Sequence, residues 1–191
     1  ETPVITTKTK VVLPPSDEAS SRLIVPPGFA IRIFADGLDG TPRFMTVSPE
    51  GDLFVSLYKG GKVVRLPDRN HDGIADAVEV VASGLNSPHG LEFFNGWLYV
   101  AENNKVTRLR DGDGNGSMEI SELVTDNLPG GGGHSSRTLH FGPDGLLYVS
   151  AGSSCNICIE SDPRRAAILR FNPDGSIPAD NPFADSNDVK K

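Results

Sequence analysis

The most constraining feature of the sequence is a short motif that occurs three times. A leucine, an aromatic residue and a valine stand together at residues 53–55, 98–100 and 147–149. A spacing of roughly 45 to 50 residues is typical of a repeated unit of about four strands. Around each triplet, apolar and polar residues alternate with period two, and no helical stripe of useful length is present. The sequence therefore predicts an all-β protein.

Three repeats can be aligned by eye, at residues 41–85, 87–128 and 136–176. Each is expected to form four antiparallel strands, with tight turns where proline, glycine and acidic residues cluster, at Pro49–Asp52 and Pro143–Gly145. Units of this kind are the blades of a β-propeller. We therefore expect about three four-stranded blades in this chain.

The chain carries too few repeats to form a closed ring, because a propeller needs at least about four blades. We assign residues 23–176 to the first three blades of the propeller domain. Residues 1–22 are polar and punctuated by proline, and we expect an extended arm there. Residues 177–191 are expected to be a loop leading to blades that this chain lacks. The same gene product or a second chain would supply the remainder.

The composition of the chain argues against binding to nucleic acid and against a segment that spans a membrane. A formal net charge of -7 argues against nucleic acid, which is bound by clustered Lys and Arg. No stretch approaches the roughly 18 to 20 apolar residues that span a bilayer. The sequence begins at Glu1 without the apolar core of a signal peptide, which is compatible with a processed, exported protein or with a chain shortened for expression. We expect a periplasmic or secreted protein.

Two acidic loops have the spacing of the twelve-residue calcium loop, although no helices are expected beside them. Oxygen-bearing side chains stand at alternate positions, a glycine at position 6 permits the sharp turn, and position 7 offers a carbonyl. The candidate ligands are Asp68, Asn70, Asp72, Ile74, Asp76 and Glu79 in the first loop, and Asp111, Asp113, Asn115, Ser117, Glu119 and Glu122 in the second. The alternative is that Asp, Asn and Gly form solvated turns with no metal.

Both acidic loops should lie on one face of the disc. Connections in a four-stranded meander alternate between the two faces, and these loops join the third strand to the fourth in successive repeats. We expect calcium there to have a structural role. The segments that lead into each first strand, and those that join the second strand to the third, should lie on the opposite face.

The opposite face carries the candidate catalytic residue, His134, which follows glycines 130–133. Histidine suits proton abstraction near neutral pH, because its unperturbed pKa is about 6.5. Arg43, His89 and Arg137 stand at the starts of the three first strands, where they could attract an anionic ligand over the central axis. The alternative is that these groups hydrogen-bond loop carbonyls around a water-filled channel.

The third repeat contains an insertion, GSSCNICIESDPRR, between its second and third strands. Cys155 and Cys158 could form a local disulfide, a redox pair or half of a metal site. Zinc would need further ligands, and the c-type haem pattern lacks its histidine. A disulfide that shapes the loop is favoured in an exported protein. Arg164 and Arg165 are expected to anchor this loop or to bind an anion.

Several segments resemble the glucose/sorbosone dehydrogenases, the soluble quinoprotein sugar dehydrogenases. They include VPPGFAIRIFADGL, SPEGDLFVS, GLNSPHGLEF, LYVAENNKVTRL and the stretch from Gly142 to Gly175. The likeness covers residues 25–176. It implies a six-bladed β-propeller that binds pyrroloquinoline quinone (PQQ), with calcium beside the cofactor. It also implies a sugar or sugar-aldehyde substrate, whose hydride passes to the quinone while His134 takes the hydroxyl proton.

The resemblance also limits what this chain can contain. The family's remaining cofactor-binding residues, and the ligands of its cofactor calcium, lie in later blades, so the two acidic loops are not those ligands. The three carboxylates of PQQ would fit Arg43, His89 and Arg137. Two other functions are open: a calcium-dependent hydrolase of the sugar-lactonase type, and a propeller that only binds a partner. The hydrolase would place carboxylates and amides on the axis, where this chain has Arg and His.

Overall fold

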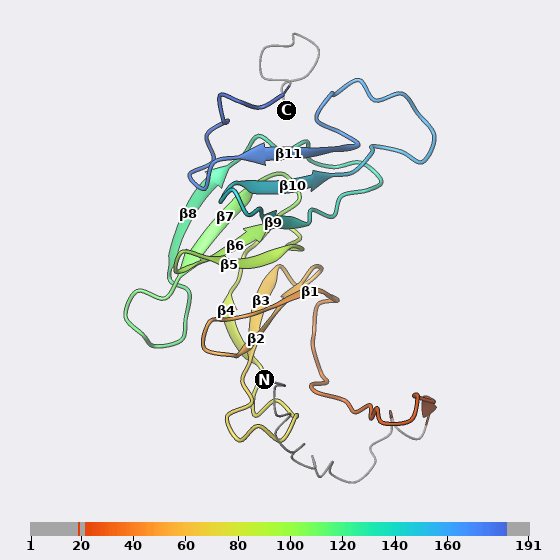
Figure 1. Ribbon diagram of the computed structural model, residues 1–191, viewed down its shortest axis with the longest axis vertical. Helices are drawn as coiled ribbons and strands as arrows, with labels where there is room; N and C mark the ends of the chain where they lie inside the picture. The colour runs from red at the N-terminus through yellow and green to blue at the C-terminus, as the bar shows by residue number, and fades with distance from the viewer. Residues whose placement is uncertain (1–18, 20–21, 183–191) are drawn as a thin grey trace, which may run out of the picture.

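The computed structural model describes Ala19 and residues 22–182, and it confirms the all-β propeller fold (Figure 1). Three antiparallel sheets follow one another along the chain. The first contains β1 (Pro42–Val47), β2 (Leu53–Leu57), β3 (Lys62–Leu66) and β4 (Glu79–Ala82). The second contains β5 (Leu91–Phe94), β6 (Trp97–Ala101), β7 (Val106–Arg110) and β8 (Ile120–Thr125). The third contains β9 (Leu139–Phe141), β10 (Leu147–Ala151) and β11 (Ala167–Phe171).

Each sheet is a meander in which consecutive strands pair. The repeated Leu-aromatic-Val triplet lies in the second strand of each sheet, in β2, β6 and β10. The sheets contact one another through their first strands, since β1 contacts β5 and β5 contacts β9. This arrangement is that of three consecutive wedges, with β1, β5 and β9 innermost.

The third sheet differs from the prediction of four strands, because the described residues supply only three. After β11 the chain makes a tight turn in which Asn172 donates its amide hydrogen to the carbonyl of Ser176. The following loop folds back onto the sheet, where the Asn181 side chain exchanges hydrogen bonds with Arg170. The side chain of Arg170 therefore binds this returning loop.

Two apolar clusters join the wedges. Between the first and second sheets, Phe54, Val63 and Val81 pack with Leu91 and Leu98. Between the second and third sheets, Tyr99, Ala101 and Val106 pack with Leu139, Phe141 and Val149, and Phe94 stacks on Phe141 with ring centroids 3.8 Å apart. Burying these side chains between sheets removes apolar surface from water and fixes the relative positions of the blades.

The segment that precedes β1 covers the outer flank of the first sheet. Phe34, Ala35 and Leu38 pack against a third cluster, which contains Val55, Leu57, Val64 and Leu66. The predicted arm, residues 1–22, lies outside the described residues apart from Ala19 and Arg22, which belong to a helical turn. Within the part of the chain that the structure describes, no helix has the length and apolarity needed to cross a bilayer.

Candidate functional site

The acidic loops and His134 lie on opposite faces, as the alternation of connections predicts. A cavity of about 590 Å³ is lined by Arg43, Tyr58 and His134, together with two serines that precede β9 and one in β10. A second hollow, of about 360 Å³, is lined by residues of the turn between β1 and β2, such as Glu50 and Asp52, and by the loop that begins at Asp111. In Figure 1 the loop between β7 and β8 projects on the side away from the loop between β10 and β11. We call the first hollow the axial pocket.

The backbone of His134 is paired with the inserted loop of the third blade. Gly133 donates its amide hydrogen to the carbonyl of Ser154 at 2.7 Å, and His134 donates to that of Ser153 at 3.3 Å. Gly152 permits this approach, because a Cβ there would lie 2.6 Å from the Cβ of His134. The imidazole is exposed, and its Nε2 lies 3.0 Å from Oδ1 of Asn156. His134 is thus held from both its backbone and its ring.

Arg137 is fully buried beneath His134. Its guanidinium donates to the carbonyls of Pro129 at 2.6 Å, His134 at 2.9 Å and Ser136 at 3.0 Å. Burial, and then the nearby charge of Arg165, lower the pKa of Arg137. Arg137 does not line the axial pocket. It holds the glycine-rich segment in place through carbonyl contacts, and its predicted contact with a cofactor stays a prediction.

Arg43 and His89 occupy different environments. Arg43 lies in β1, is exposed to the axial pocket, and stacks over the ring of Tyr58 with 5.6 Å between its Cζ and the ring centroid. His89 is half-buried, and its Nδ1 donates to the carbonyl of Arg137 at 3.2 Å. Burial is the main cause that lowers the pKa of His89. Of the three predicted anion-binding groups, Arg43 alone lines the pocket in the described structure.

The second acidic loop gathers three carboxylates. Asp111, Asp113 and Glu119 each offer an oxygen, and these atoms lie within 4.8 Å of one another. Asp111 accepts backbone hydrogen bonds from Gly116 and Gly114, and the bond from Gly116 is the main cause that lowers the pKa of Asp111. Asn115 accepts a bond from the amide of Ser117. Asp111, Asp113 and Glu119 are therefore the residues of this loop that could hold a hard cation.

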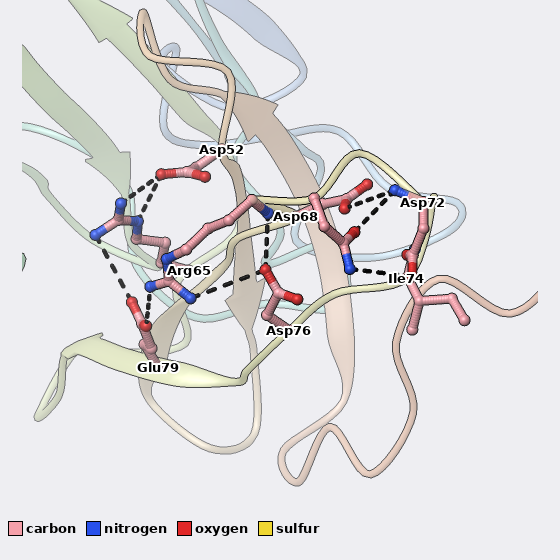
Figure 2. Close-up of polar contacts among 9 residues, drawn as sticks. Asp52, Arg65, Asp68, Asp72, Ile74, Asp76 and Glu79 are labelled. Carbon is pink, nitrogen blue, oxygen red and sulfur yellow. Dashed lines mark hydrogen bonds and ion pairs between the residues drawn. The ribbon is translucent and has the colours of Figure 1, made fainter.

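The glutamate at position 12 of each loop is bonded to arginine. Glu122 accepts two hydrogen bonds from Arg108. Figure 2 shows the equivalent Glu79 beside Arg65, which also binds Asp52, and Arg69 donates to Glu79 at 2.9 Å. Each of these glutamates thus has an arginine partner, and neither belongs to the carboxylate group at the tip of the second loop.

The first acidic loop is closed by hydrogen bonds among its own residues. Figure 2 shows Asp68 beside the amide of Asp72, from which it accepts a hydrogen bond. Asp68 also accepts from the amide of Gly73, Asn70 accepts from that of Asp72, and Asp72 accepts from that of Ile74. Asp76 accepts from the amide of Arg69. Within the described residues, the first loop forms no group of carboxylates comparable to that at Asp111.

Cys155 and Cys158 form a disulfide, the pairing favoured in an exported protein. The loop around them is tied down by Glu160, which accepts bonds from the hydroxyls of Ser153 and Ser154. Those bonds, led by the one from Ser153, lower the pKa of Glu160. Arg165 donates to the carbonyls of Gly130 and Gly131, and Arg164 binds Asp162 and Asn127. Both arginines anchor the loop, as one of the two predictions for them states.

Sequence reasoning missed two contacts of the site. Tyr58 lines the axial pocket, and its hydroxyl lies 2.7 Å from that of Ser135. Asn156 meets His134 from within the disulfide ring. The alternation of connections places both residues on the face that carries His134. No local sequence pattern indicates which side chains on that face contact one another.

A family model described as "Domain of unknown function (DUF7133)" matches residues 15–181, which is most of the chain. The chain belongs to the DUF7133 family. A curated relative of this DUF7133 chain, an uncharacterized protein of Borreliella burgdorferi, is 24% identical over 170 residues, which cover 82% of this chain and 42% of the relative. The chain thus spans less than half the length of that protein.

Solved structures similar to this DUF7133 chain include enzymes named for sugars and PQQ. The calcium structure of a Trichoderma reesei carbohydrate-active enzyme of family AA12 is 21% identical, with a TM-score of 0.67, over 83% of this chain and 41% of that one. The PQQ domain of a Coprinopsis cinerea pyranose dehydrogenase is 20% identical, with a TM-score of 0.63, over 74% and 35%. The PQQ-bound aldose sugar dehydrogenase of Streptomyces coelicolor is 23% identical, with a TM-score of 0.60, over 80% and 50%. At these identities the likeness establishes the fold.

Proposed function

We propose that the protein to which this chain belongs is a PQQ-dependent dehydrogenase of sugars or sugar aldehydes, with His134 as the general base. The observation that carries the proposal is the axial pocket. It places an exposed imidazole and an arginine around one cavity of about 590 Å³, and none of its lining residues is a carboxylate. Such a pocket is suited to an anionic ligand beside a proton acceptor.

The residues present fit PQQ on the side of the pocket that this chain supplies. Arg43 forms no ion pair among the described residues and faces the cavity, so its charge is available to a carboxylate of the cofactor. Tyr58 holds Arg43 through its ring. PQQ, when bound, would supply the acceptor for the hydride, which carries both electrons of the oxidation. His134 would accept the proton of the substrate hydroxyl, and the loops that carry it would shield the site from water.

The lining of the axial pocket also separates this function from the alternatives. A metal-dependent lactonase needs oxygen ligands on the axis, and the described lining offers serine and tyrosine hydroxyls but no carboxylate. A propeller that only binds a partner gives no reason for an exposed histidine fixed from two sides at the pocket wall. The remaining cofactor contacts would come from blades outside this chain, supplied by the same gene product or by a second chain.

We further propose that calcium binds the loop at Asp111 as a structural ion and that the protein is periplasmic or secreted. The three carboxylates of the loop support the first statement, because Ca²⁺ prefers oxygen ligands. The Cys155–Cys158 disulfide supports the second, because disulfides persist in oxidising compartments.

The test is turnover of an aldose by the intact protein, with PQQ, calcium and an artificial electron acceptor. Replacing His134 by Gln should lower kcat by about 10² to 10⁴, the usual contribution of a general base. His140→Gln is the matched control, because His140 is 78% exposed on β9, bonded to Glu92, and outside the axial pocket. Full activity of His134→Gln would refute the assignment, and the absence of PQQ binding in an absorbance titration would refute the cofactor.

A further inference from the structure

We infer that Asn156 is a positioning residue for His134, presented to it by the Cys155–Cys158 ring. The inference rests on the proposed function of His134 as a base. Its direct observation is the contact between His134 Nε2 and Asn156 Oδ1, 3.0 Å apart. The two residues belong to different loops, the glycine-rich segment before β9 and the insertion after β10.

With the Asn156 amide oriented so that its oxygen meets Nε2, the contact indicates which ring nitrogen can act as the base. An amide oxygen only accepts hydrogen bonds, so Nε2 must carry the hydrogen that it donates. In the neutral imidazole the other nitrogen, Nδ1, is then free of hydrogen and able to accept a proton. Asn156 therefore selects the tautomer of His134 and restrains the rotation of its ring. A histidine that accepts a proton needs this kind of second group to orient it.

The loop is built to hold Asn156 in place. The disulfide joins Cys155 to Cys158, so Asn156 lies inside a ring closed by four consecutive residues. Cys155 is fixed in turn, because its carbonyl accepts a bond from the hydroxyl of Ser153. On the other side of the ring, Glu160 accepts bonds from Ser153 and Ser154. These constraints lower the entropy that the loop would lose in holding the imidazole.

The neighbouring position has no such role. Ile157 occupies the same ring, but 97% of its surface is exposed. Truncating Ile157 therefore changes the loop without changing the contact with His134. Asp at position 156 would retain an acceptor oxygen of the same reach, whereas Leu would match the shape of Asn and remove the acceptor. These three substitutions separate the hydrogen bond from the presence of the loop.

The experiment measures the His134 ring and turnover in the same intact protein. In Asn156→Leu we expect the ¹³C order parameter of the His134 Cδ2–H bond to fall below about 0.6, the range of flexible groups. We expect kcat to fall about tenfold or more with KM within twofold, because a misplaced catalytic group can cost on the order of 10² in rate. Asn156→Asp should keep the ring ordered and kcat within about threefold of wild type, and Ile157→Ala should leave both unchanged.

The ring measurement does not depend on the proposed chemistry. If Asn156→Leu leaves both the order parameter and kcat at wild-type values, the inference is wrong while the assignment of His134 stands. If His134→Gln keeps full activity, the assignment of the base fails, and with it the positioning role, whatever the ring shows. Should Asn156→Leu fail to fold, Asn156→Ser, which shortens the side chain and keeps it polar, replaces it with the same expected losses.

Discussion

The hydroxyl of Tyr58 lies 2.7 Å from the hydroxyl of Ser135, although the first residue follows β2 and the second precedes β9. This contact joins the first blade to the third across the axial pocket. Neighbouring wedges are joined by apolar clusters and by hydrogen bonds such as that between His140 and Glu92. The Tyr58–Ser135 bond is therefore a direct link between blades that are not adjacent in the chain.

Tyr58→Phe removes this link and keeps the ring on which Arg43 stacks. We expect the free energy of unfolding to fall by about 1 kcal/mol, the net value of one hydrogen bond. Ser135→Ala should cost about as much, and the double variant should cost less than the sum because both changes remove the same bond. Urea unfolding of the four proteins measures this coupling. Strictly additive losses would show that the two hydroxyls do not interact.

Arg137→Met should destabilise the glycine-rich segment. The substitution leaves three carbonyls without the guanidinium that now binds them, and the side chain of Arg137 itself is fully buried. We expect a loss of about 3 kcal/mol or more in the free energy of unfolding, because buried polar groups lose their partners. Limited proteolysis should show new cleavage near residues 129–134. Wild-type stability and an unchanged digest would contradict the anchoring role of Arg137.

Calcium should stabilise the protein through Asp111 and not through Glu122. A ligand that binds only the folded state adds about 2.7 kcal/mol at a concentration of 100 times its Kd. Asp111→Asn should remove most of the calcium-dependent rise in Tm, because Asp111 belongs to the group of three carboxylates. Glu122→Gln should lower Tm without calcium, by weakening the bond with Arg108, and keep the rise. Scanning calorimetry with calcium and with a chelator distinguishes the two effects. An unchanged rise in Asp111→Asn would exclude calcium at this loop.

His89 should make stability depend on pH below about 6.5, its unfolded pKa. Burial lowers the pKa of His89 in the folded protein, so the unfolded chain binds the proton first as pH falls. The stabilisation is complete above about 6.5 and is lost as pH falls towards the folded pKa, at no more than about 1.4 kcal/mol per pH unit. His89→Asn should lose less stability between pH 7 and 5 in urea unfolding. Equal losses in both proteins would contradict the burial effect.

Gly175→Ala should be severely destabilising. Gly175 has a φ of 87°, and a Cβ there would lie 1.7 Å from the carbonyl oxygen of Val124 in β8. Gly51→Ala is the matched control, because Gly51 has a φ of 99° but no atom within 4 Å of a Cβ. We expect about 1 kcal/mol for Gly51 from backbone strain alone, and more than about 3 kcal/mol for Gly175, measured by thermal unfolding. Equal losses would show that the turn can move away from β8.

Much of the fold could be predicted because the repeat is explicit. The Leu-aromatic-Val triplets of the three repeats lie in the second strands, β2, β6 and β10. The alternation of connections placed His134 and Asp111 on opposite faces correctly, since the rule depends only on the order of the strands. The fourth strand expected in the third blade does not follow β11 within the described residues, where the returning loop meets Arg170 instead.

The site was predicted less completely because its contacts are long-range. The acidic spacing includes Asp111, Asp113 and Glu119, whose carboxylates lie together, but Glu122 belongs to the same pattern and is bonded to Arg108 across the sheet. In the same way, Arg137 has the charge of an anion-binding residue, but its side chain is fully buried and donates hydrogen bonds to backbone carbonyls. The partner of a charged side chain depends on the register of neighbouring strands. The spacing of residues along the sequence does not give that register.

The apolar side chains of this molecule are shared between sheets, and few are enclosed by one sheet alone. Phe94 of the second blade rests on Phe141 of the third, and Phe54 of the first meets Phe93 of the second. If a single blade detached, apolar surface of both that blade and its neighbour would become exposed to water. Melting of the three blades should accordingly proceed as one concerted transition, and the damage from a core substitution in any blade should spread to all of them.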